Sequence, residues 1–314
     1  MSNMEAMKNI LIATSSFAKE RPELLDLLRQ YGFQVFLNPW SRQLKESELV
    51  ELLELHRPVG LLAGTEPVTN RVMEKTRDHL LVISRVGVGW DNVDRDAAAK
   101  YGILVYRTSG VLTQAVAELT IGLILGALRS IPLHDRMIRA HQWGKRMGGL
   151  LAGKLIGIIG FGAIGQRVGE LARAFGAEVA FYDSQPVESS WAHSMPFQML
   201  LEQADIISLH ASGKEQILGE KELRIISGRN AILVNTARGE LIDEEALFHT
   251  LKDGQIAYVC LDVFWEEPYA GQLCNMDNVI LTPHVGSYAR EARHLMEETA
   301  VHNLIMGLKE KKIL

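Results

Sequence analysis

Short strand-like runs rich in β-branched residues alternate with helical patterns along the whole chain. In the first third, strand-like runs lie at residues 8–13, 34–37, 59–63 and 80–84, and helical patterns lie at residues 22–31, 46–55 and 72–76. The first helical pattern begins with Pro22 and ends before Gly32, which are favoured at the start and just past the end of a helix. This alternation is typical of a parallel sheet with helices on both faces.

The alternation restarts after Tyr101-Gly102. Further strand-like runs lie at residues 103–105, 154–159, 178–182, 205–209, 231–234, 256–260 and 279–281. Helical patterns lie at residues 114–128, 163–175 and 288–308, and the first of these is so apolar that we expect it to be buried. The sequence therefore predicts two doubly wound α/β domains, with a crossing near residue 102 and a return near residue 286.

Composition supports two globular domains and narrows the function classes. The chain has 314 residues, of which 47% are apolar and 23% charged, enough for two sizeable cores. Its net charge is −5 and it has no block of basic residues, so we expect neither a nucleic-acid nor a membrane partner.

The cysteines and the N-terminal segment bear on the compartment. Cys260 and Cys274 are the only cysteines, and neither lies in a metal-type pair, so we expect no disulfide scaffold and no metal site. The N-terminal residues lack the pattern of a signal peptide, and the longest membrane-like stretch, residues 119–128, is about half a bilayer span. A cytoplasmic location is expected.

A glycine-rich loop indicates a dinucleotide. Residues 160–165 read Gly-Phe-Gly-Ala-Ile-Gly, in which the first glycine permits a tight turn, the second admits a pyrophosphate and the third allows close helix packing. The spacing alone would also fit an ordinary glycine-rich turn. Here it directly follows a strand-like run and opens a helical pattern, and this context predicts dinucleotide binding.

Asp183 indicates which dinucleotide binds. It ends the next strand-like run, 18 residues after Gly165, where an acidic residue accepts hydrogen bonds from the adenosine ribose. Its carboxylate would repel a 2′-phosphate, and residues 184–186 (Ser-Gln-Pro) add no cation. NAD is predicted as the cofactor.

Three polar segments follow later strand-like runs and suggest hydride-transfer chemistry. They are residues 235–239, 262–268 and 282–286, which supply Arg, Glu and His. The carboxyl ends of parallel strands meet at one edge, so these side chains are expected to share a crevice. A guanidinium can hold a 2-keto acid, an imidazole can donate a proton and a carboxylate can keep that imidazole charged. Each residue alone would also fit a surface charge or an ordinary loop residue, and their joint position favours catalysis.

Six stretches closely resemble the D-isomer-specific 2-hydroxyacid dehydrogenase family, which includes 3-phosphoglycerate dehydrogenases and glyoxylate/hydroxypyruvate reductases. They are residues 87–94, 115–120, 160–165, 235–239, 261–268 and 278–286. The resemblance implies a Rossmann NAD domain (residues 103–286) inserted into a flavodoxin-like substrate-binding domain (residues 1–102 and 287–314). It also implies a homodimer joined through the NAD domain, which would explain the apolar segment 115–128.

The resemblance assigns roles to individual residues. Arg238 is implied to bind substrate, Glu267 to be the carboxylate of a catalytic dyad and His284 to be its acid/base. The implied substrate-binding residues are Arg85, Val86, Gly87, Arg238 and His284. The implied cofactor-binding residues are Thr113, Gly160, Gly162, Ala163, Ile164, Gly165, Asp183, His210, Thr236, Ala237, Arg238, Asp262, His284 and Gly286.

The substrate is left open among members of this family. Arg85 and Arg129 match basic positions of phosphoglycerate dehydrogenases, whereas the arginine usual near residues 64–65 is missing. Arg85 would equally serve to support the glycine loop that follows it, and Arg129 to cap a helix. The leading hypothesis is an NAD-dependent dehydrogenase of D-2-hydroxy acids, possibly of 3-phosphoglycerate. The alternatives are a glyoxylate/hydroxypyruvate reductase and a non-enzymatic, NAD-sensing corepressor on the same fold.

The chain also departs from the family at two places on the cofactor side. Ala163 replaces an arginine that often contacts the pyrophosphate, and residues 211–214 (Ala-Ser-Gly-Lys) replace a proline-containing stretch.

Overall fold

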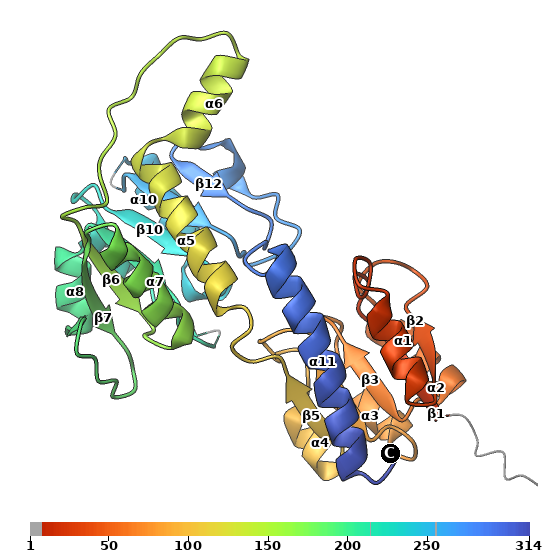
Figure 1. The fold of residues 1–314 in the computed structure, drawn as a ribbon. Coiled ribbons are helices and arrows are strands. Elements are labelled where there is room, and N and C mark those ends of the chain that lie inside the picture. The colour runs from red at the N-terminus through yellow and green to blue at the C-terminus, as the bar shows by residue number, and fades with distance from the viewer. Residues whose placement is uncertain (1–7, 214, 255) are drawn as a thin grey trace, which may run out of the picture. The chain divides into compact units, whose positions relative to one another are not determined.

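The chain forms two compact units, each built around its own parallel sheet (Figure 1). The computed structural model describes residues 8–213, 215–254 and 256–314. Unit 1 comprises the chain up to Leu112 together with Arg290–Leu314, and unit 2 comprises Thr113–Ala289.

Unit 1 has a five-stranded sheet of flavodoxin-like order. Its strands are β1 (Lys8–Ile12), β2 (Phe33–Leu37), β3 (Gly60–Ala63), β4 (Val82–Arg85) and β5 (Leu104–Arg107). They are arranged β2-β1-β3-β4-β5, and all neighbouring pairs are parallel. This order places a topological switch point between β1 and β3, where open α/β sheets commonly bind ligands at the carboxyl ends of their strands.

Helices cover both faces of this sheet. Those of unit 1 are α1 (Glu23–Gln30), α2 (Glu46–His56), α3 (Asn70–Thr76), α4 (Arg95–Lys100) and α11 (Arg290–Glu310). Buried residues of α2, α3 and α4 share one core cluster with the sheet. The long α11 packs on β3, β4 and β5, and the Ser84 hydroxyl donates a hydrogen bond to the carbonyl of Ala300 at 2.8 Å. The return of the chain thus completes unit 1.

Unit 2 has a seven-stranded sheet with the strand order of a Rossmann fold. Its strands are β6 (Leu155–Ile159), β7 (Glu178–Tyr182), β8 (His193–Ser194), β9 (Ile206–Leu209), β10 (Ile232–Asn235), β11 (Tyr258–Leu261) and β12 (Val279–Leu281). They are arranged β12-β11-β10-β9-β6-β7-β8, and all pairs are parallel. The order reverses between β6 and β9, which again creates a switch point. The predicted combination of Rossmann and flavodoxin-like domains is confirmed.

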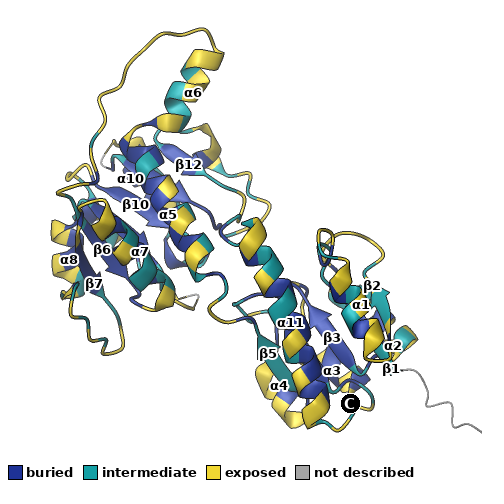
Figure 2. Ribbon diagram, viewed as in Figure 1, coloured by how far each residue is buried: buried dark blue, intermediate teal, exposed yellow. Residues whose placement is uncertain are grey.

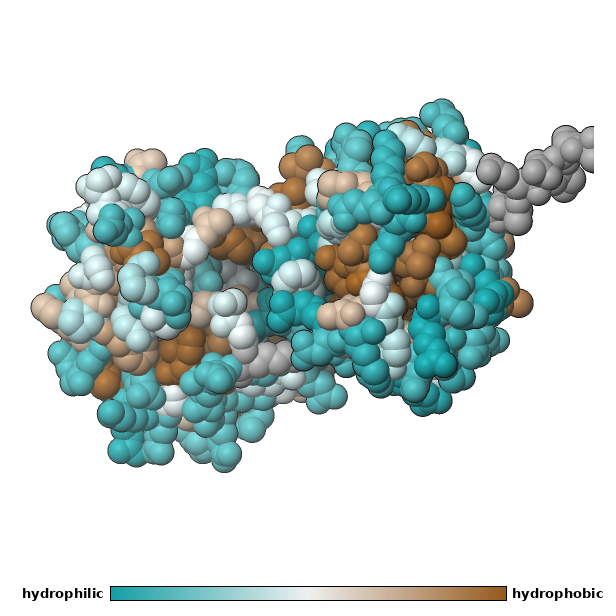
Figure 3. Space-filling view, turned by 90° about the horizontal axis from the view of Figure 1, so that it is seen from below, coloured by the Kyte–Doolittle hydropathy of each residue, from teal (hydrophilic) through white to brown (hydrophobic). Residues whose placement is uncertain are grey.

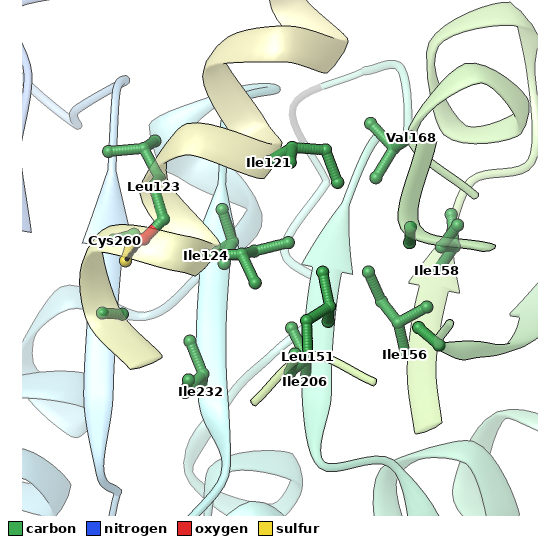
Figure 4. Packing of buried hydrophobic residues seen from close by; sticks show 14 of the residues in the cluster. Ile121, Leu123, Ile124, Leu151, Ile156, Ile158, Val168, Ile206, Ile232 and Cys260 are labelled. Atoms are coloured by element: carbon green, nitrogen blue, oxygen red, sulfur yellow. Dashed lines mark hydrogen bonds between the residues drawn. The ribbon is translucent and has the colours of Figure 1, made fainter. Parts of the chain in front are cut away.

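The helices of unit 2 cover its sheet from two sides. They are α5 (Thr113–Leu128), α6 (Ile131–Arg139), α7 (Ala163–Ala174), α8 (Phe197–Gln203), α9 (Glu220–Ile226) and α10 (Glu244–Lys252), with 3-10 turns at Gly239–Leu241 and Gln272–Asn275. Two core clusters lie on opposite faces, one with α5 and α7 and the other with α8, α9 and α10. Figure 4 shows Ile121 and Ile124 of α5 in the same apolar cluster as Ile206 and Ile232 of the strands.

Burial within unit 2 explains the apolar sequence of α5. Nine of its sixteen residues are buried, and the Cys260 thiol contacts the carbonyl of Leu123 at 3.6 Å. The expectation that this helix is buried is confirmed. Its composition therefore needs no dimer partner to explain it, which corrects the reason inferred from the resemblance.

The domain boundaries differ from those predicted. Unit 2 begins at Thr113 instead of residue 103, and unit 1 resumes at Arg290 instead of residue 287. The strand predicted at residues 103–105 is β5, which pairs with β4 through Val82 and Leu104 and so belongs to unit 1. Strand-like character alone cannot show which sheet a strand joins.

Apolar side chains are exposed on α6 and on the segment after it. No residue of α6 is buried, and the helix is coloured mostly as exposed in Figure 2. Ile131, Ile138, Trp143, Met147 and Leu150 are all more than half exposed. Elsewhere, the face in Figure 3 mixes hydrophilic and hydrophobic residues on each unit.

Within the described residues, no single helix is long and apolar enough to cross a membrane. Only α5 and α6 taken together reach the required length and composition, and they are bent by 63° at their junction.

Two leucines of α2 allow a test of the core of unit 1. Leu53 is fully buried, whereas Leu55 is 71% exposed on the same helix. We expect Leu53→Ala to lower the free energy of unfolding by about 2–5 kcal/mol, because it leaves a cavity among packed side chains. Leu55→Ala should change it by less than about 0.5 kcal/mol. Urea unfolding of both variants measures the difference, and equal effects would contradict this assignment of the core.

Candidate active site

The glycine-rich loop between β6 and α7 is anchored by its phenylalanine. Phe161 is 1% exposed and stacks on Phe181, with ring centroids 3.9 Å apart. Gly162 and Ala163, by contrast, are exposed, and α7 begins at Ala163 with no side chain capping it. The loop thus turns its aromatic side chain into the core and presents its backbone and the start of α7 outward. Unpaired N–H groups at a helix start favour an anion.

The three glycines of the loop serve different purposes. Gly160 has φ +90°, and a Cβ there would lie 2.5 Å from the Ala211 nitrogen. A Cβ at Gly165 would lie 2.2 Å from the Gly160 carbonyl oxygen, so this glycine permits close packing of α7. A Cβ at Gly162 would meet nothing within 4 Å. Gly160 and Gly165 are therefore required by the fold, whereas Gly162 borders open space that a phosphate group can approach.

Asp183 lies beside this loop, as the sequence predicts. One carboxylate oxygen accepts a hydrogen bond from the Phe161 nitrogen at 2.7 Å, and the other accepts one from the Gln185 nitrogen at 2.9 Å. Asp183 is half-buried at the end of β7. The same carboxylate therefore braces the glycine loop and places a negative charge where an adenosine ribose is expected.

His210 lies behind the loop as a neutral side chain. A Cβ at Gly160 would lie 2.6 Å from the His210 carbonyl carbon, and the ring Nε2 lies 2.8 Å from the Ser208 hydroxyl. Burial lowers the pKa of His210 to about 3, so the ring is uncharged near neutral pH. Its Nδ1 is buried and has no hydrogen-bond partner in the described part of the chain. A cofactor contact of His210 stays a prediction.

The loop after β10 is shaped by Asn235. This fully buried side chain donates to the Arg238 carbonyl at 2.7 Å and accepts from the Ala237 nitrogen at 3.0 Å. A Cβ at Gly239 would lie 2.1 Å from the Phe264 carbonyl carbon, so this loop packs directly against the loop after β11. Asn235 and Gly239 thereby set the position of Arg238.

Asp262 fixes the loop that carries His284. The carboxylate is 1% exposed, and one of its oxygens accepts hydrogen bonds from the Thr282 hydroxyl at 2.5 Å and the Val285 nitrogen at 2.8 Å. The other oxygen accepts one from the Gly286 nitrogen at 2.8 Å. Asp262 therefore holds the loop after β12 from both sides, and the cofactor contact that the resemblance implies for it stays a prediction.

His284 and Glu267 form a direct pair. The His284 Nδ1 lies 2.8 Å from one oxygen of Glu267 and 3.1 Å from the other. The same carboxylate accepts from the Phe264 nitrogen at 3.2 Å, which orients it. His284 is about half exposed and has φ +52°, a left-handed conformation uncommon for a non-glycine residue. This geometry commits Nδ1 to the carboxylate and leaves Nε2 for proton transfer.

The first half of α5 borders these loops. The Thr236 hydroxyl lies 3.0 Å from that of Thr120, and a Cβ at Gly286 would lie 3.4 Å from a methyl group of Val116. Thr113 is the first residue of this helix. Arg129 follows the opposite end, with roughly 14 Å of helix between it and Thr120. Within unit 2, Arg129 is therefore separated from the other candidate residues.

The candidate residues of unit 1 lie at the end of β4 and directly after it. Arg85 ends the strand, the Val86 nitrogen donates to the Ala63 carbonyl at 2.7 Å, and Gly87 has φ +148°. They lie at the carboxyl edge of the unit 1 sheet, beside the loop that follows β3. Over the described residues, no group of three or more His, Cys, Asp or Glu could hold a metal ion.

Comparison with known proteins decides the family. Residues 121–286 match the family model described as "D-isomer specific 2-hydroxyacid dehydrogenase, NAD binding domain". The chain belongs to the D-isomer specific 2-hydroxyacid dehydrogenase family. The family model describes an NAD-binding domain, and a D-lactate dehydrogenase among the solved structures similar to this chain is complexed with NAD, so the predicted family, enzyme class and cofactor are confirmed.

Relatives in the 2-hydroxyacid dehydrogenase family differ in their named substrates. Glyoxylate reductase of Thermococcus litoralis is 40% identical over 277 residues, covering 82% of this chain and 83% of that protein. D-3-phosphoglycerate dehydrogenase of Methanocaldococcus jannaschii is also 40% identical, over 80% of this chain and 49% of that protein. The crystal structure of a glyoxylate reductase from Paecilomyes thermophila has a TM-score of 0.86 and 29% identity, covering 97% of this chain and 96% of that one.

The residues around the glycine loop fit the NAD of a 2-hydroxyacid dehydrogenase. Gly162 leaves open space at the uncapped start of α7, and Asp183 supplies the acceptor expected for a ribose. The carboxylate also disfavours the extra phosphate of NADP. The start of α7 would hold the pyrophosphate and Asp183 the adenosine ribose.

We expect the loop glycines to separate folding from cofactor binding. Gly162→Ala should leave the thermal unfolding temperature unchanged yet weaken NADH binding by about tenfold or more, because the methyl group enters the space of the pyrophosphate. Gly160→Ala should lower both, because its Cβ collides with backbone. Thermal unfolding and NADH fluorescence titration measure the two effects. Unchanged NADH affinity in Gly162→Ala would contradict the assigned phosphate position.

Asp183 should control the choice between NADH and NADPH. We expect Asp183→Asn to lower the ratio of kcat/KM with NADH to that with NADPH by about tenfold or more, because the charge that repels the 2′-phosphate is removed. Glu188→Gln, an exposed residue of the following loop, makes the same charge change and should leave the ratio unchanged. Equal ratios in Asp183→Asn and the parent enzyme would remove Asp183 from cofactor selection.

Proposed function

We propose that this chain interconverts small, unphosphorylated D-2-hydroxy acids and their 2-keto acids, with reduction of glyoxylate or hydroxypyruvate as its activity. The pair of His284 and Glu267, 2.8 Å apart on the loops after β12 and β11, carries the proposal. A histidine oriented by a carboxylate is suited to deliver a proton to a keto oxygen.

The chain's own residues would divide the work as follows. Arg238 would hold the substrate carboxylate through its planar guanidinium and polarise the keto group. The Nε2 of His284 would donate its proton to the keto oxygen on reduction and take it back on oxidation. Glu267 would fix the ring through Nδ1, and Asp262 would keep the histidine loop in place. When NAD is bound, its nicotinamide ring supplies or accepts the hydride.

A second candidate substrate is 3-phosphohydroxypyruvate, the keto acid of a phosphoglycerate dehydrogenase. It is favoured by Arg85 at the end of β4 and by the relative from M. jannaschii. The arginine expected near residues 64–65 in that group is missing, and Arg129 lies at the far end of α5. The unphosphorylated keto acids are therefore preferred.

A substrate panel tests the proposed function. NADH oxidation is followed with glyoxylate, hydroxypyruvate, pyruvate and 3-phosphohydroxypyruvate at matched concentrations. Turnover of glyoxylate or hydroxypyruvate with the highest kcat/KM supports the proposal. A clear preference for 3-phosphohydroxypyruvate would favour the second candidate, and no turnover with any keto acid would overturn both.

His284 should be required for proton transfer. We expect His284→Asn to lower kcat by about 100-fold or more, the effect of losing a general acid. Asparagine is chosen because it tolerates the left-handed backbone found at this position. His249→Asn, an exposed histidine of α10, is the matched control and should keep kcat unchanged. Similar kcat values for both variants would exclude His284 as the acid.

We also propose that the chain forms a homodimer whose interface buries the apolar residues of α6 and of residues 140–150. We further propose that the protein is located in the cytoplasm. Trp143 is 85% exposed and Met147 is 97% exposed, and such a concentration of large apolar residues is typical of an interface. We expect Trp143→Glu to shift the chain from dimer to monomer in light-scattering measurements. Leu55→Glu, at a leucine of unit 1 that is 71% exposed, should leave the dimer intact. A monomeric parent protein would contradict this interface.

A further inference from the structure

Glu66 is a buried carboxylate of unit 1 that the proposed mechanism does not use. It is 1% exposed and lies in the loop after β3. In the described part of the chain, the other carboxylates buried to this degree are Asp262, which holds the histidine loop, and Glu297, which pairs with Arg293. A buried carboxylate is costly unless hydrogen bonds or a cation compensate it. The buried carboxylate of Glu66 therefore needs hydrogen-bond donors or a cation nearby.

Backbone groups hold Glu66 firmly in this loop. Its Oε1 accepts a hydrogen bond from the Gly64 nitrogen at 2.8 Å. The Asn92 side chain donates to the carbonyls of both Glu66, at 2.7 Å, and Gly64, at 3.2 Å. A Cβ at Gly64 would lie 2.9 Å from Oε2, so the glycine makes room for the carboxylate. These contacts keep the carboxylate at the carboxyl edge of the sheet.

Arg85 is the cation next to it. Arg85 of β4 lies opposite Ala63 of β3 in the register of the sheet, and Ala63 is three residues before Glu66 in the sequence. Burial raises the pKa of Glu66, and hydrogen bonds from backbone N–H groups and, to a smaller extent, the charge of Arg85 oppose that rise. The two side chains therefore act on each other electrostatically across the ends of β3 and β4.

The guanidinium of Arg85 lies directly on the segment expected to bind substrate. Its Nη1 donates to the Val86 carbonyl at 3.1 Å, and a Cβ at Gly87 would lie 1.2 Å from the same nitrogen. Any side chain at residue 87 would displace the arginine. Gly87 therefore lets the guanidinium fold over the backbone of Val86-Gly87.

We propose that Glu66 and Arg85 form a charge selector, in which the buried carboxylate offsets the guanidinium and so disfavours substrates with a phosphorylated side chain. The proposal rests on the proposed function and specifies its substrate class. An arginine alone beside this segment would attract a phosphate dianion. With the Glu66 carboxylate next to Arg85, a phosphate dianion is attracted by the guanidinium and repelled by the carboxylate. An uncharged substrate side chain, with or without a hydroxyl group, experiences neither force. Water and salt screen a buried charge little, so its effect on a nearby substrate is strong.

Hydroxypyruvate and 3-phosphohydroxypyruvate provide the test, because they differ only in the phosphate group. We compare their kcat/KM values in the parent enzyme and in Glu66→Gln at the same alkaline pH, because a higher pH favours the ionised form of a carboxylate whose pKa is raised. Glutamine keeps the shape and the acceptor for the Gly64 nitrogen and removes the charge. The parent enzyme should favour hydroxypyruvate by about tenfold or more, and Glu66→Gln should shift the ratio toward the phosphorylated substrate by about tenfold or more.

Glu74→Gln is the matched control. Glu74 is an exposed residue of α3 in the same unit, so its substitution makes the same charge change away from the strand ends and should leave the ratio unchanged. A shift of equal size in Glu74→Gln would show a general effect of net charge and would overturn the selector.

The remaining outcomes are distinguishable. Turnover of both substrates with an unchanged ratio in Glu66→Gln overturns the selector and leaves the proposed function standing. No turnover of any 2-keto acid by the parent enzyme overturns the proposed function and the selector with it. If Glu66→Gln does not fold, inhibition of the parent enzyme by D-glycerate and by 3-phospho-D-glycerate decides. Weaker inhibition by the phosphorylated acid supports the selector, and stronger inhibition overturns it.

Discussion

The buried carboxylate of Asp262 is the interaction on which the arrangement of the candidate catalytic residues depends. It lies one residue after β11 and accepts three hydrogen bonds from the loop after β12. Strand pairing fixes only where that loop starts, so the carboxylate supplies the remaining constraint. With the loop held, His284 keeps a left-handed backbone and its Nδ1 faces Glu267. Loss of this carboxylate would leave the N–H groups of Val285 and Gly286 and the Thr282 hydroxyl without their acceptor at once.

A similar arrangement of polar side chains at strand ends supports the other loops at the carboxyl edge of the unit 2 sheet. Asn235 shapes the loop after β10, and Asp183 ties the end of β7 to the glycine loop. In each case a polar residue at a strand end accepts backbone N–H groups of a loop that carries or faces a functional group. Parallel strands make this possible, because their carboxyl ends lie along one edge. Rigid strands thus provide the positions, and strand-end polar residues provide the loop conformations.

Much of the fold could be predicted because strong local patterns mark its main elements. Every strand predicted in the sequence is present to within two residues at either end, and the glycine loop lies between a strand and a helix as expected. The helices α4, α6, α8, α9 and α10 were not predicted; they have six to nine residues each and few turns in which to show an apolar period, although α1 and α3 of similar length were predicted. The boundary at residue 103 was wrong because β5 is assigned by its pairing with β4, which is a long-range property.

The candidate site likewise contains residues that the sequence could identify and residues that only the folded structure reveals. Arg238, Glu267 and His284 stand out because chemistry limits which residue types can occupy those positions. Asn235 is part of a segment that the sequence singles out, yet its role depends on a bond to a carbonyl three residues away. Glu66 gives no signal at all, since burial of a carboxylate and its proximity to Arg85 arise only when β3 and β4 pair. The reaction can therefore be inferred from residue types, whereas the proposed charge selector depends on which charges strand pairing brings together.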